Sequence, residues 1–273
     1  MIKNKESVYD KGMQTKEKSM STIIKKMKAE HVKRPLICAP LVGKTFEAIK
    51  EELFVITKKQ PGLIEWRVDF FEEIDKTESV IETGKWIKEN ARGIPVLFTR
   101  RSNREGGQPI TLSEEEVTKL YVSVLEADII DAVDVELSCP KEAKETILSL
   151  AKDKEIQTVM SFHDFSKTPK KEELLDVLKQ AQEEGGDVGK IALMPKSLRD
   201  VLLVAEVTEE ANRGLTIPII TMSMGPKGAL SRLVGGAFGS AVSFAVGQTA
   251  SAPGQIQIDQ LEKVLDVIDA SQE

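Results

Sequence analysis

A lysine on an otherwise apolar stretch is the residue with the clearest chemical potential in this chain. A glycine-rich turn at residues 185–189 precedes Lys190, and apolar residues follow it up to Pro195. If this stretch is a strand, alternation places Lys190 on the same face as Ala192 and Met194. The lysine then either lies at the strand mouth and extends its ammonium group to water, or it is a desolvated amine that attacks a carbonyl.

A histidine precedes this lysine by one predicted strand. His163 follows an apolar run that begins near Gln157, and it is the one histidine in the repeating part of the chain. A lone histidine commonly has a structural role, but the carboxyl ends of neighbouring strands in a barrel face one mouth. Imidazole is the usual general acid or base near neutral pH. The two residues together favour imine chemistry assisted by proton transfer.

Charged residues gather at the ends of three other predicted strands. They are Glu65, Arg67 and Asp69 on one strand, Arg100, Arg101 and Glu105 after the next, and Asp134 and Glu136 on a third. Two interpretations explain such a set: a buried ion-pair network, or a binding site for an oxyanion or a hydroxyl-rich ligand. For the third strand we favour the network, whereas the arginines suit an anionic ligand.

Later segments supply an apolar wall, a further cation and a loop. Met222 and Met224 share one face of a predicted strand, where they either fill the core or surround an amine with apolar atoms. Arg232 follows near the start of a predicted helix. The loop at residues 249–255 is rich in small residues, includes Ser251 and Gln255, and is suited to act as a lid.

These residues lie on a repeating pattern of short apolar strands and amphipathic helices that begins at Pro35. Eight strands are expected, at residues 36–40, 63–68, 95–99, 129–137, 157–162, 190–194, 218–222 and 241–246. Apolar spacings of three and four mark the helices between them, and Ser113 with Glu116 forms a predicted capping box. The pattern predicts an α/β fold, a single-domain (β/α)8 TIM barrel; an open doubly wound sheet is the alternative.

The composition is ordinary for a globular protein and disfavours several classes of function. Of the 273 residues, 41% are hydrophobic and 30% are charged, with a net charge of -6 that argues against nucleic-acid binding. Two cysteines and two histidines cannot form the usual zinc cage or a disulfide framework, so we expect a protein of the reducing cytoplasm. No apolar run is long enough to span a bilayer, so no membrane partner is expected. The glycines around Lys190 lack the spacing of nucleotide-binding loops, and we expect neither a metal nor a cofactor.

The first 34 residues differ from the rest of the chain. Residues 1–34 are rich in Lys, Ser and Glu and lack the apolar core of a signal peptide. They are expected to form a short N-terminal extension that is partly disordered. Residues 35–273 are expected to form the (β/α)8 barrel, which is the catalytic domain.

Seven short motifs follow one another between residue 34 and the end of the chain. They are Glu65-Trp66-Arg67-Val68-Asp69, Arg101-Ser102 with Glu105-Gly106-Gly107, Val133-Asp134-Val135-Glu136, Ser161-Phe162-His163-Asp164, Lys190-Ile191-Ala192, Met222-Ser223-Met224-Gly225 and Ser251-Ala252-Pro253-Gly254-Gln255. Together they resemble the type I 3-dehydroquinate dehydratase (3-dehydroquinase) family, the class that forms a Schiff base. The resemblance implies a TIM barrel, commonly a homodimer, that acts as a lyase without metal or cofactor. Its hydro-lyase reaction converts 3-dehydroquinate to 3-dehydroshikimate in the shikimate pathway of aromatic amino acid biosynthesis.

The resemblance also implies a role for each candidate residue. Lys190 matches the Schiff-base lysine, His163 matches the general acid and base, and Glu105 matches the carboxylate that positions this histidine. Arg232 matches the group that binds the substrate carboxylate. The remaining matches are Glu65, Arg67, Arg101, Ser251 and Gln255 around the ring hydroxyls and carboxylate, and Met222 and Met224 at the apolar wall. Of the two adjacent arginines, the motif favours Arg101 over Arg100.

Two other functions fit the same residues. A class I aldolase that acts on a phosphorylated sugar shares the barrel lysine, although the arginine-rich mouth favours a carboxylate substrate. A non-catalytic barrel would bind the metabolite without releasing water. An assay of phosphorylated against carboxylated substrates separates the first alternative, and formation of a conjugated enone product excludes the second.

Overall fold

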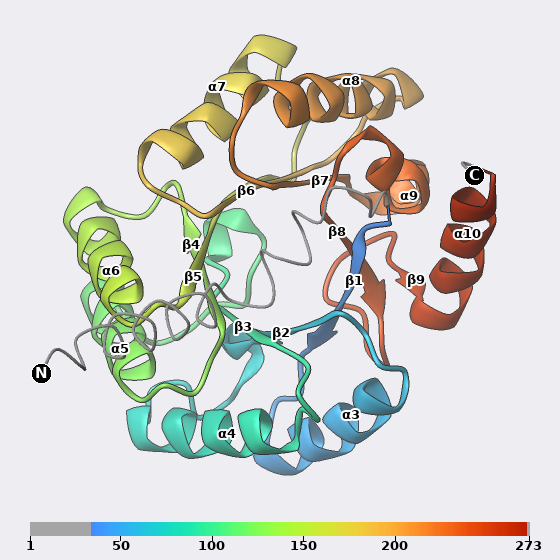
Figure 1. Ribbon diagram of the computed structural model, residues 1–273. Helices are drawn as coiled ribbons and strands as arrows, with labels where there is room; N and C mark the ends of the chain where they lie inside the picture. Colours follow the sequence, from blue (N-terminus) through green and yellow to red (C-terminus); the bar gives the residue numbers. More distant parts are fainter. Residues whose placement is uncertain (1–33, 272–273) are drawn as a thin grey trace, which may run out of the picture.

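Eight parallel strands form the centre of the structure, a computed structural model that describes residues 34–271 (Figure 1). The strands are β1 (Leu36–Leu41), β2 (Leu63–Arg67), β3 (Val96–Thr99), β4 (Ala132–Glu136), β5 (Gln157–Asp164), β6 (Val188–Leu193), β7 (Ile219–Ser223) and β8 (Val242–Val246). Each of β1 to β6 pairs with the next strand, and β1 also pairs with β8. A short ninth strand, β9 (Ile256–Gln257), pairs with β8. The disorder expected in residues 1–34 concerns positions that, except for Arg34, lie outside the described residues.

The ring closes between β7 and β8 through one bridge. Ile219 of β7 pairs with Ser240, and the Ala241 N–H donates to the Ile219 carbonyl at 2.8 Å. The Ser240 hydroxyl accepts a hydrogen bond from the Thr221 N–H at 3.0 Å. The closed TIM barrel is therefore confirmed, and the open doubly wound sheet is wrong.

All eight predicted strands are present, although several ends differ. The strand predicted at residues 129–137 shortens to β4, which begins just after Asp131, whose carboxylate accepts from the Val96 N–H at 2.8 Å. β6 begins two residues earlier than predicted, since Val188 and Gly189 already pair with β5. β5 in turn extends to Asp164, and this extension carries His163 on regular strand backbone.

Eight α-helices of residues 34–271 surround the strands. They are α3 (Phe46–Lys58), α4 (Thr77–Asn90), α5 (Glu114–Glu126), α6 (Lys141–Asp153), α7 (Lys171–Glu183), α8 (Leu198–Gly214), α9 (Gly225–Val234) and α10 (Ile258–Ala270), with single 3-10 turns at Val68–Phe70, Asn103–Glu105 and Gly235–Phe238. The predicted capping box of Ser113 and Glu116 begins α5 and is confirmed. Within residues 34–271, no helix combines the length and the apolar character that crossing a membrane requires.

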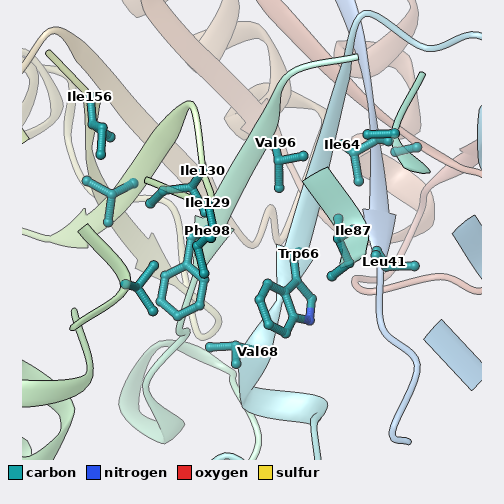
Figure 2. Packing of buried hydrophobic residues seen from close by; sticks show 14 of the residues in the cluster. Leu41, Ile64, Trp66, Val68, Ile87, Val96, Phe98, Ile129, Ile130 and Ile156 are labelled. Carbon is teal, nitrogen blue, oxygen red and sulfur yellow. The ribbon is translucent and has the colours of Figure 1, made fainter. Parts of the chain in front are cut away.

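The outward-facing strand residues pack against these helices to form the main core. Trp66 of β2 and Phe98 of β3 meet edge to face with ring centroids 5.5 Å apart, and Phe98 meets Tyr121 of α5 at the same separation. Figure 2 shows Trp66 and Phe98 among aliphatic side chains such as Val68 and Ile87. Because successive side chains of a strand alternate, this packing leaves the intervening residues to face the barrel axis.

The inward-facing residues form an apolar floor with a polar layer above it. The floor contains Cys38, Leu63, Leu97, Ala132, Val159, Val188, Ile220 and Val242. Two positions further along five of these strands lie Glu65, Thr99, Asp134, Ser161 and Lys190, all of them buried. A period of two therefore places every member of this polar layer toward the barrel axis, on the side of the carboxyl ends of the strands.

The helix-facing core predicts a sharp contrast between two leucines. Leu53 of α3 is 1% exposed, whereas Leu202 of α8 is 67% exposed. Leu53→Ala is expected to lower the free energy of unfolding by about 2–5 kcal/mol, because it removes packed methyl groups and leaves a cavity. Leu202→Ala is the matched control and should change it by less than about 0.5 kcal/mol. Urea unfolding of both variants measures this, and equal losses would contradict the burial pattern.

Candidate active site

A pocket opens at the carboxyl ends of the strands, and every predicted site residue lines it. It encloses about 450 Å³ of space, part of it open to solvent. The predicted residues in its wall are Glu65, Arg67, Arg101, Glu105, His163, Lys190, Met222, Met224, Arg232, Ser251 and Gln255. The (β/α)8 topology thus brings residues that are far apart in the sequence into one pocket. Glu65 and Gln255, for example, are separated by 190 positions. Whether each residue has its predicted role remains a prediction.

Lys190 lies at the base of this pocket and does not extend to water. Its side chain is 3% exposed, and Nζ lies 3.2 Å from Glu65 Oε1 and 3.1 Å from Asp134 Oδ2. The Phe244 ring covers the same nitrogen, with its centroid 4.6 Å away. The interpretation of Lys190 as a solvent-directed cation is therefore wrong. The amine is buried, with two carboxylates and an aromatic face around it.

Asp134 connects Lys190 to the neighbouring arginine. It is fully buried, and its Oδ1 accepts from Arg101 Nη2 at 2.8 Å and from the Ser161 hydroxyl at 2.6 Å. Burial alone would raise the Asp134 pKa, but the positive charges of Arg101 and Lys190 hold it below its ordinary value. The predicted ion-pair network is confirmed. The direct contact between Asp134 and Lys190 is a feature that sequence reasoning missed.

Arg101 is held by protein carboxylates on several sides. Its Nη1 donates to Glu136 Oε1 and to Ser161 Oγ, both at 2.9 Å. Burial disfavours the cation, but the charges of Asp134 and Glu136 raise the Arg101 pKa above its ordinary value. Arg100 points away from the pocket and donates to Glu114 on α5 at 3.1 Å. The motif-based preference for Arg101 as the pocket residue is thus confirmed.

Arg67 is oriented by a neighbour on its own segment. Its Nε and Nη2 donate to the two carboxylate oxygens of Asp69, each at 2.8 Å, in the bidentate geometry that fixes a guanidinium plane. Asp69 also accepts from the Gln108 N–H at 3.0 Å, which ties the loop after β3 to the end of β2. Arg67 therefore presents a rigid, partly neutralised cation to the pocket.

His163 and Glu105 form a hydrogen-bonded pair across the pocket wall. His163 Nδ1 lies 2.9 Å from Glu105 Oε2, the same oxygen accepts from the His163 N–H at 3.0 Å, and the Ser138 hydroxyl donates to Glu105 Oε1 at 2.7 Å. Burial and the nearby charge of Glu136 raise the Glu105 pKa to about 7. Burial, together with the charges of Arg101, Lys190 and Arg67, lowers the His163 pKa well below 6.5. At neutral pH the imidazole is uncharged, with Nε2 left to the pocket.

Arg232 is a buried cation that faces no carboxylate of the described residues. It is 2% exposed, and its guanidinium makes only long contacts, at 3.4 Å to the Phe244 and Pro253 carbonyls and at 3.5 Å to Met222 Sδ, while Nε has no partner within residues 34–271. It lies in the last turn of α9, not near the start of a helix as predicted. Burial lowers its pKa to about 10, so it stays charged at neutral pH. A carboxylate of a ligand would satisfy this group.

The remaining wall of the pocket is apolar on one side and polar on the other. Met222 and Met224 are buried, and they belong to the same apolar cluster as Phe244. On the loop after β8, Ser251 and Gln255 bind each other, with Gln255 Nε2 donating to Ser251 Oγ at 3.1 Å. Across residues 34–271, no group of three or more His, Cys, Asp or Glu side chains has a geometry suited to hold a metal ion.

Two aromatic residues of the pocket were not predicted. Phe244 faces the axis because it lies two positions beyond Val242 of the floor, so strand alternation alone could have identified it. Phe165 follows the end of β5 and packs against Gly106, where an added Cβ would lie 2.3 Å from the ring. Gly106 also adopts a φ of 83°, so a side chain at this position is disfavoured both by the Phe165 ring and by the backbone conformation. No sequence pattern places Phe165, because it lies in a loop.

The charge balance around Asp134 leads to a prediction about stability. Asp134→Asn leaves the buried Lys190 and Arg101 with one carboxylate fewer, and it is expected to lower the free energy of unfolding by about 3–5 kcal/mol. Asp153→Asn, an exposed position on α6, is the control and should have an effect below about 0.5 kcal/mol. Urea unfolding at neutral pH measures both, and equal effects would show that Asp134 does not balance these cations.

Comparison with known proteins places the chain in one family. The model of the type I 3-dehydroquinase family matches residues 37–272. A 3-dehydroquinate dehydratase from Shouchella clausii (strain KSM-K16) is 52% identical over 250 residues, which cover 92% of this chain and 98% of that protein. A second, from Aromatoleum aromaticum, is 50% identical over 239 residues, which cover 88% of this chain and 92% of the relative.

Solved structures agree with these sequence matches. The crystal structure of 3-dehydroquinate dehydratase from Geobacillus kaustophilus HTA426 superposes with a TM-score of 0.86 at 45% identity, covering 88% of this chain and 93% of that one. The type I enzyme from Clostridium difficile, solved with covalently modified comenic acid, gives a TM-score of 0.84 at 40% identity, covering 87% and 94% of the two chains. The chain described here belongs to the type I 3-dehydroquinase family.

Proposed function

We propose that this protein dehydrates 3-dehydroquinate to 3-dehydroshikimate through a Schiff base on Lys190, with His163 as the general acid and base. Family membership carries the reaction, a hydro-lyase step of the shikimate pathway. The observation that carries the residue assignment is that two buried cations with different surroundings, Lys190 and Arg232, line one pocket. Lys190 has carboxylate partners, whereas Arg232 has none among residues 34–271 and is free to bind an anion. This pair fits a substrate with a ketone and a carboxylate.

Imine formation begins with the amine of Lys190. Nζ must release a proton before it attacks the ketone carbon, and Glu65 and Asp134 lie 3.2 and 3.1 Å away, within reach of that proton. Loss of water from the addition product gives an iminium ion. The iminium draws electrons from the neighbouring carbon and acidifies its hydrogen.

His163 moves the protons of the elimination. Nε2 accepts the hydrogen from the acidified carbon, and the resulting enamine expels the β-hydroxyl group, which takes a proton from the imidazolium and leaves as water. Glu105 holds Nδ1 at 2.9 Å and stabilises the imidazolium while it carries the extra proton. Water then hydrolyses the product imine and returns free Lys190.

The remaining pocket residues position the ring. Arg232 binds the substrate carboxylate, and Glu65, Arg67, Arg101, Ser251 and Gln255 surround the hydroxyl groups and the carboxylate. Met222 and Met224 line the apolar side. Because Arg67 and Arg101 are already bound by Asp69, Asp134 and Glu136, their contribution is orientation, not raw affinity.

The proposal extends to the setting of the enzyme. We propose that residues 35–273 form the catalytic domain and that residues 1–34 form an N-terminal extension. We also propose that the protein is a homodimer and that it is located in the cytoplasm. Cys38 and Cys139 are free thiols, in agreement with a reducing compartment. Sedimentation of the full chain tests the dimer.

Borohydride trapping tests the nucleophile. Reduction in the presence of 3-dehydroquinate is expected to add ligand mass at Lys190, and Lys190→Ala should abolish both adduct and turnover. Lys196→Ala, an exposed lysine just beyond the same strand, is the control and should keep both. His163→Ala should still form adduct but turn over about 100- to 10,000-fold more slowly. An active protein that never carries an adduct would falsify the Schiff-base assignment.

Borohydride trapping and an absorbance assay separate the two alternative functions. A class I aldolase would be labelled by a phosphorylated sugar in place of the carboxylated substrate. A binding barrel would bind 3-dehydroquinate without a rise in the absorbance of the conjugated enone.

The pKa values of the His163–Glu105 pair predict the acid limb of the pH–rate profile. Because the Glu105 pKa is raised to about 7, the pair takes up a proton as the pH falls through 7, and Nε2 then carries hydrogen and cannot act as a base. We expect kcat to fall below about pH 7. In Glu105→Gln the limb should move to lower pH, because the His163 pKa itself is well below 6.5, although kcat is reduced. An unmoved limb would assign it to another group.

A further inference from the structure

Glu52 of α3 is a buried acid that the catalytic scheme does not use. It is 4% exposed and belongs to no salt bridge, whereas the other buried carboxylates of residues 34–271 each pair with a cation in the pocket network. Burying a carboxylate costs free energy unless hydrogen bonds replace its water. A carboxylate in this position therefore needs donors from the segments around it.

Those donors come from two loops at the mouth of the barrel. Glu52 Oε2 accepts from the Val42 N–H at 2.7 Å, at the end of β1. Burial raises the Glu52 pKa, and the N–H groups of Val42 and Gly43, with the N–H and hydroxyl of Thr249, counteract that rise. Glu52 Oε1 is nevertheless buried with no donor of residues 34–271 at hydrogen-bond geometry. Oε2 is thus bound by Val42, whereas Oε1 is buried without a bound donor in a carboxylate environment that includes Gly43 and Thr249.

Thr249 lies in the loop that carries Ser251 and Gln255 over the pocket. Gly247 begins this loop and packs on Ile56 of α3, one turn beyond Glu52, where an added Cβ would lie 2.5 Å from the Ile56 side chain. Near its other end the loop is bound to the first residue of α9, where the Gly225 N–H donates to the Pro253 carbonyl at 3.1 Å. The loop is therefore hydrogen-bonded at Pro253, whereas near Thr249 the buried Glu52 Oε1 lacks a bound donor from residues 34–271.

We propose that Glu52 is a positioning residue for the loop at residues 247–255: Oε2 fixes Val42, and Oε1 accepts from Thr249 when substrate occupies the pocket. This contact holds Ser251 and Gln255 against the substrate. The inference rests on the proposed function, since it assigns the loop to the 3-dehydroquinate site. Glu52 itself touches no reacting atom and acts through Thr249.

Steady-state kinetics with 3-dehydroquinate test the contact. Glu52→Gln is expected to raise KM about tenfold, and Thr249→Val several-fold, with kcat within about twofold of the parent, because a hydrogen bond to a charged group is lost in the bound state. Thr249→Ser keeps the hydroxyl and should restore the parental KM. Glu51→Gln, an exposed neighbour on α3, is the matched control and should have no effect.

The double variant shows whether the two residues act together. If they share one contact, Glu52→Gln with Thr249→Val raises KM no further than Glu52→Gln alone. A rise equal to the product of the two single effects would overturn the proposal, as would a parental KM in both single variants. Thr249 is exposed, so its variants remain folded even if Glu52→Gln does not.

Hydrogen exchange separates this inference from the proposed function. In the presence of saturating 3-dehydroquinate, amides of residues 247–257 are expected to exchange several-fold faster in Thr249→Val and Glu52→Gln than in the parent, while the strands keep their protection. If the parent fails to dehydrate 3-dehydroquinate but the loop exchange still changes, the reaction is wrong and the attachment stands. If the parent is active and the loop exchange is unchanged in both variants, the attachment is wrong.

Discussion

The carboxylate of Asp134 is the interaction on which the site depends. It faces the barrel interior between two buried cations, 3.1 Å from Lys190 and 2.8 Å from Arg101. Without it, each cation would lose a partner in a region of low polarity, where uncompensated charge is costly. The surrounding polar layer is built around this balance: Ser161 supports Asp134, and Glu65 supports Lys190 from the other side. Lys190, the amine that we propose as the nucleophile, can be buried here because Glu65 and Asp134 both pair with it.

Much of this arrangement could be read from the chain, because barrel strands obey a period of two. That period alone identifies Glu65, Asp134 and Lys190 as residues that face the barrel axis. The period of two does not give the register between neighbouring strands. That register determines which carboxylate reaches Lys190. In the register of β4 with β5 and of β5 with β6, Glu136 pairs with Ser161 and Ser161 pairs with Lys190. The contact with Asp134 follows from three strands at once, and no local pattern encodes it.

Residues on helices and loops were harder to place for a different reason. Glu52 lies among the apolar positions of α3, and its burial depends on which loops cover that turn of the helix. Arg232 was expected near the start of a helix but lies at the end of α9, because this helix has only 10 residues and begins at Gly225. Phe165 enters the pocket only because Gly106 leaves room for its ring. In each case a distant segment determines the surroundings of the residue.

The closure of the barrel has a consequence for how this protein can open. Seven of the junctions in the ring are ladders of paired backbone, but β7 and β8 meet at the single bridge from Ile219 to Ser240, supplemented by the Ser240 hydroxyl. This junction is the least reinforced seam of the ring, and subglobal unfolding begins where backbone pairing is sparse. Parting there would carry away the Phe244 ring and the carbonyl contacts of Arg232 while the paired strands β1 to β6 keep Lys190 and Asp134 together. If Arg232 and Lys190 have the roles proposed above, opening at this seam would remove the surroundings of the anion-binding group before it disturbs the Schiff-base lysine.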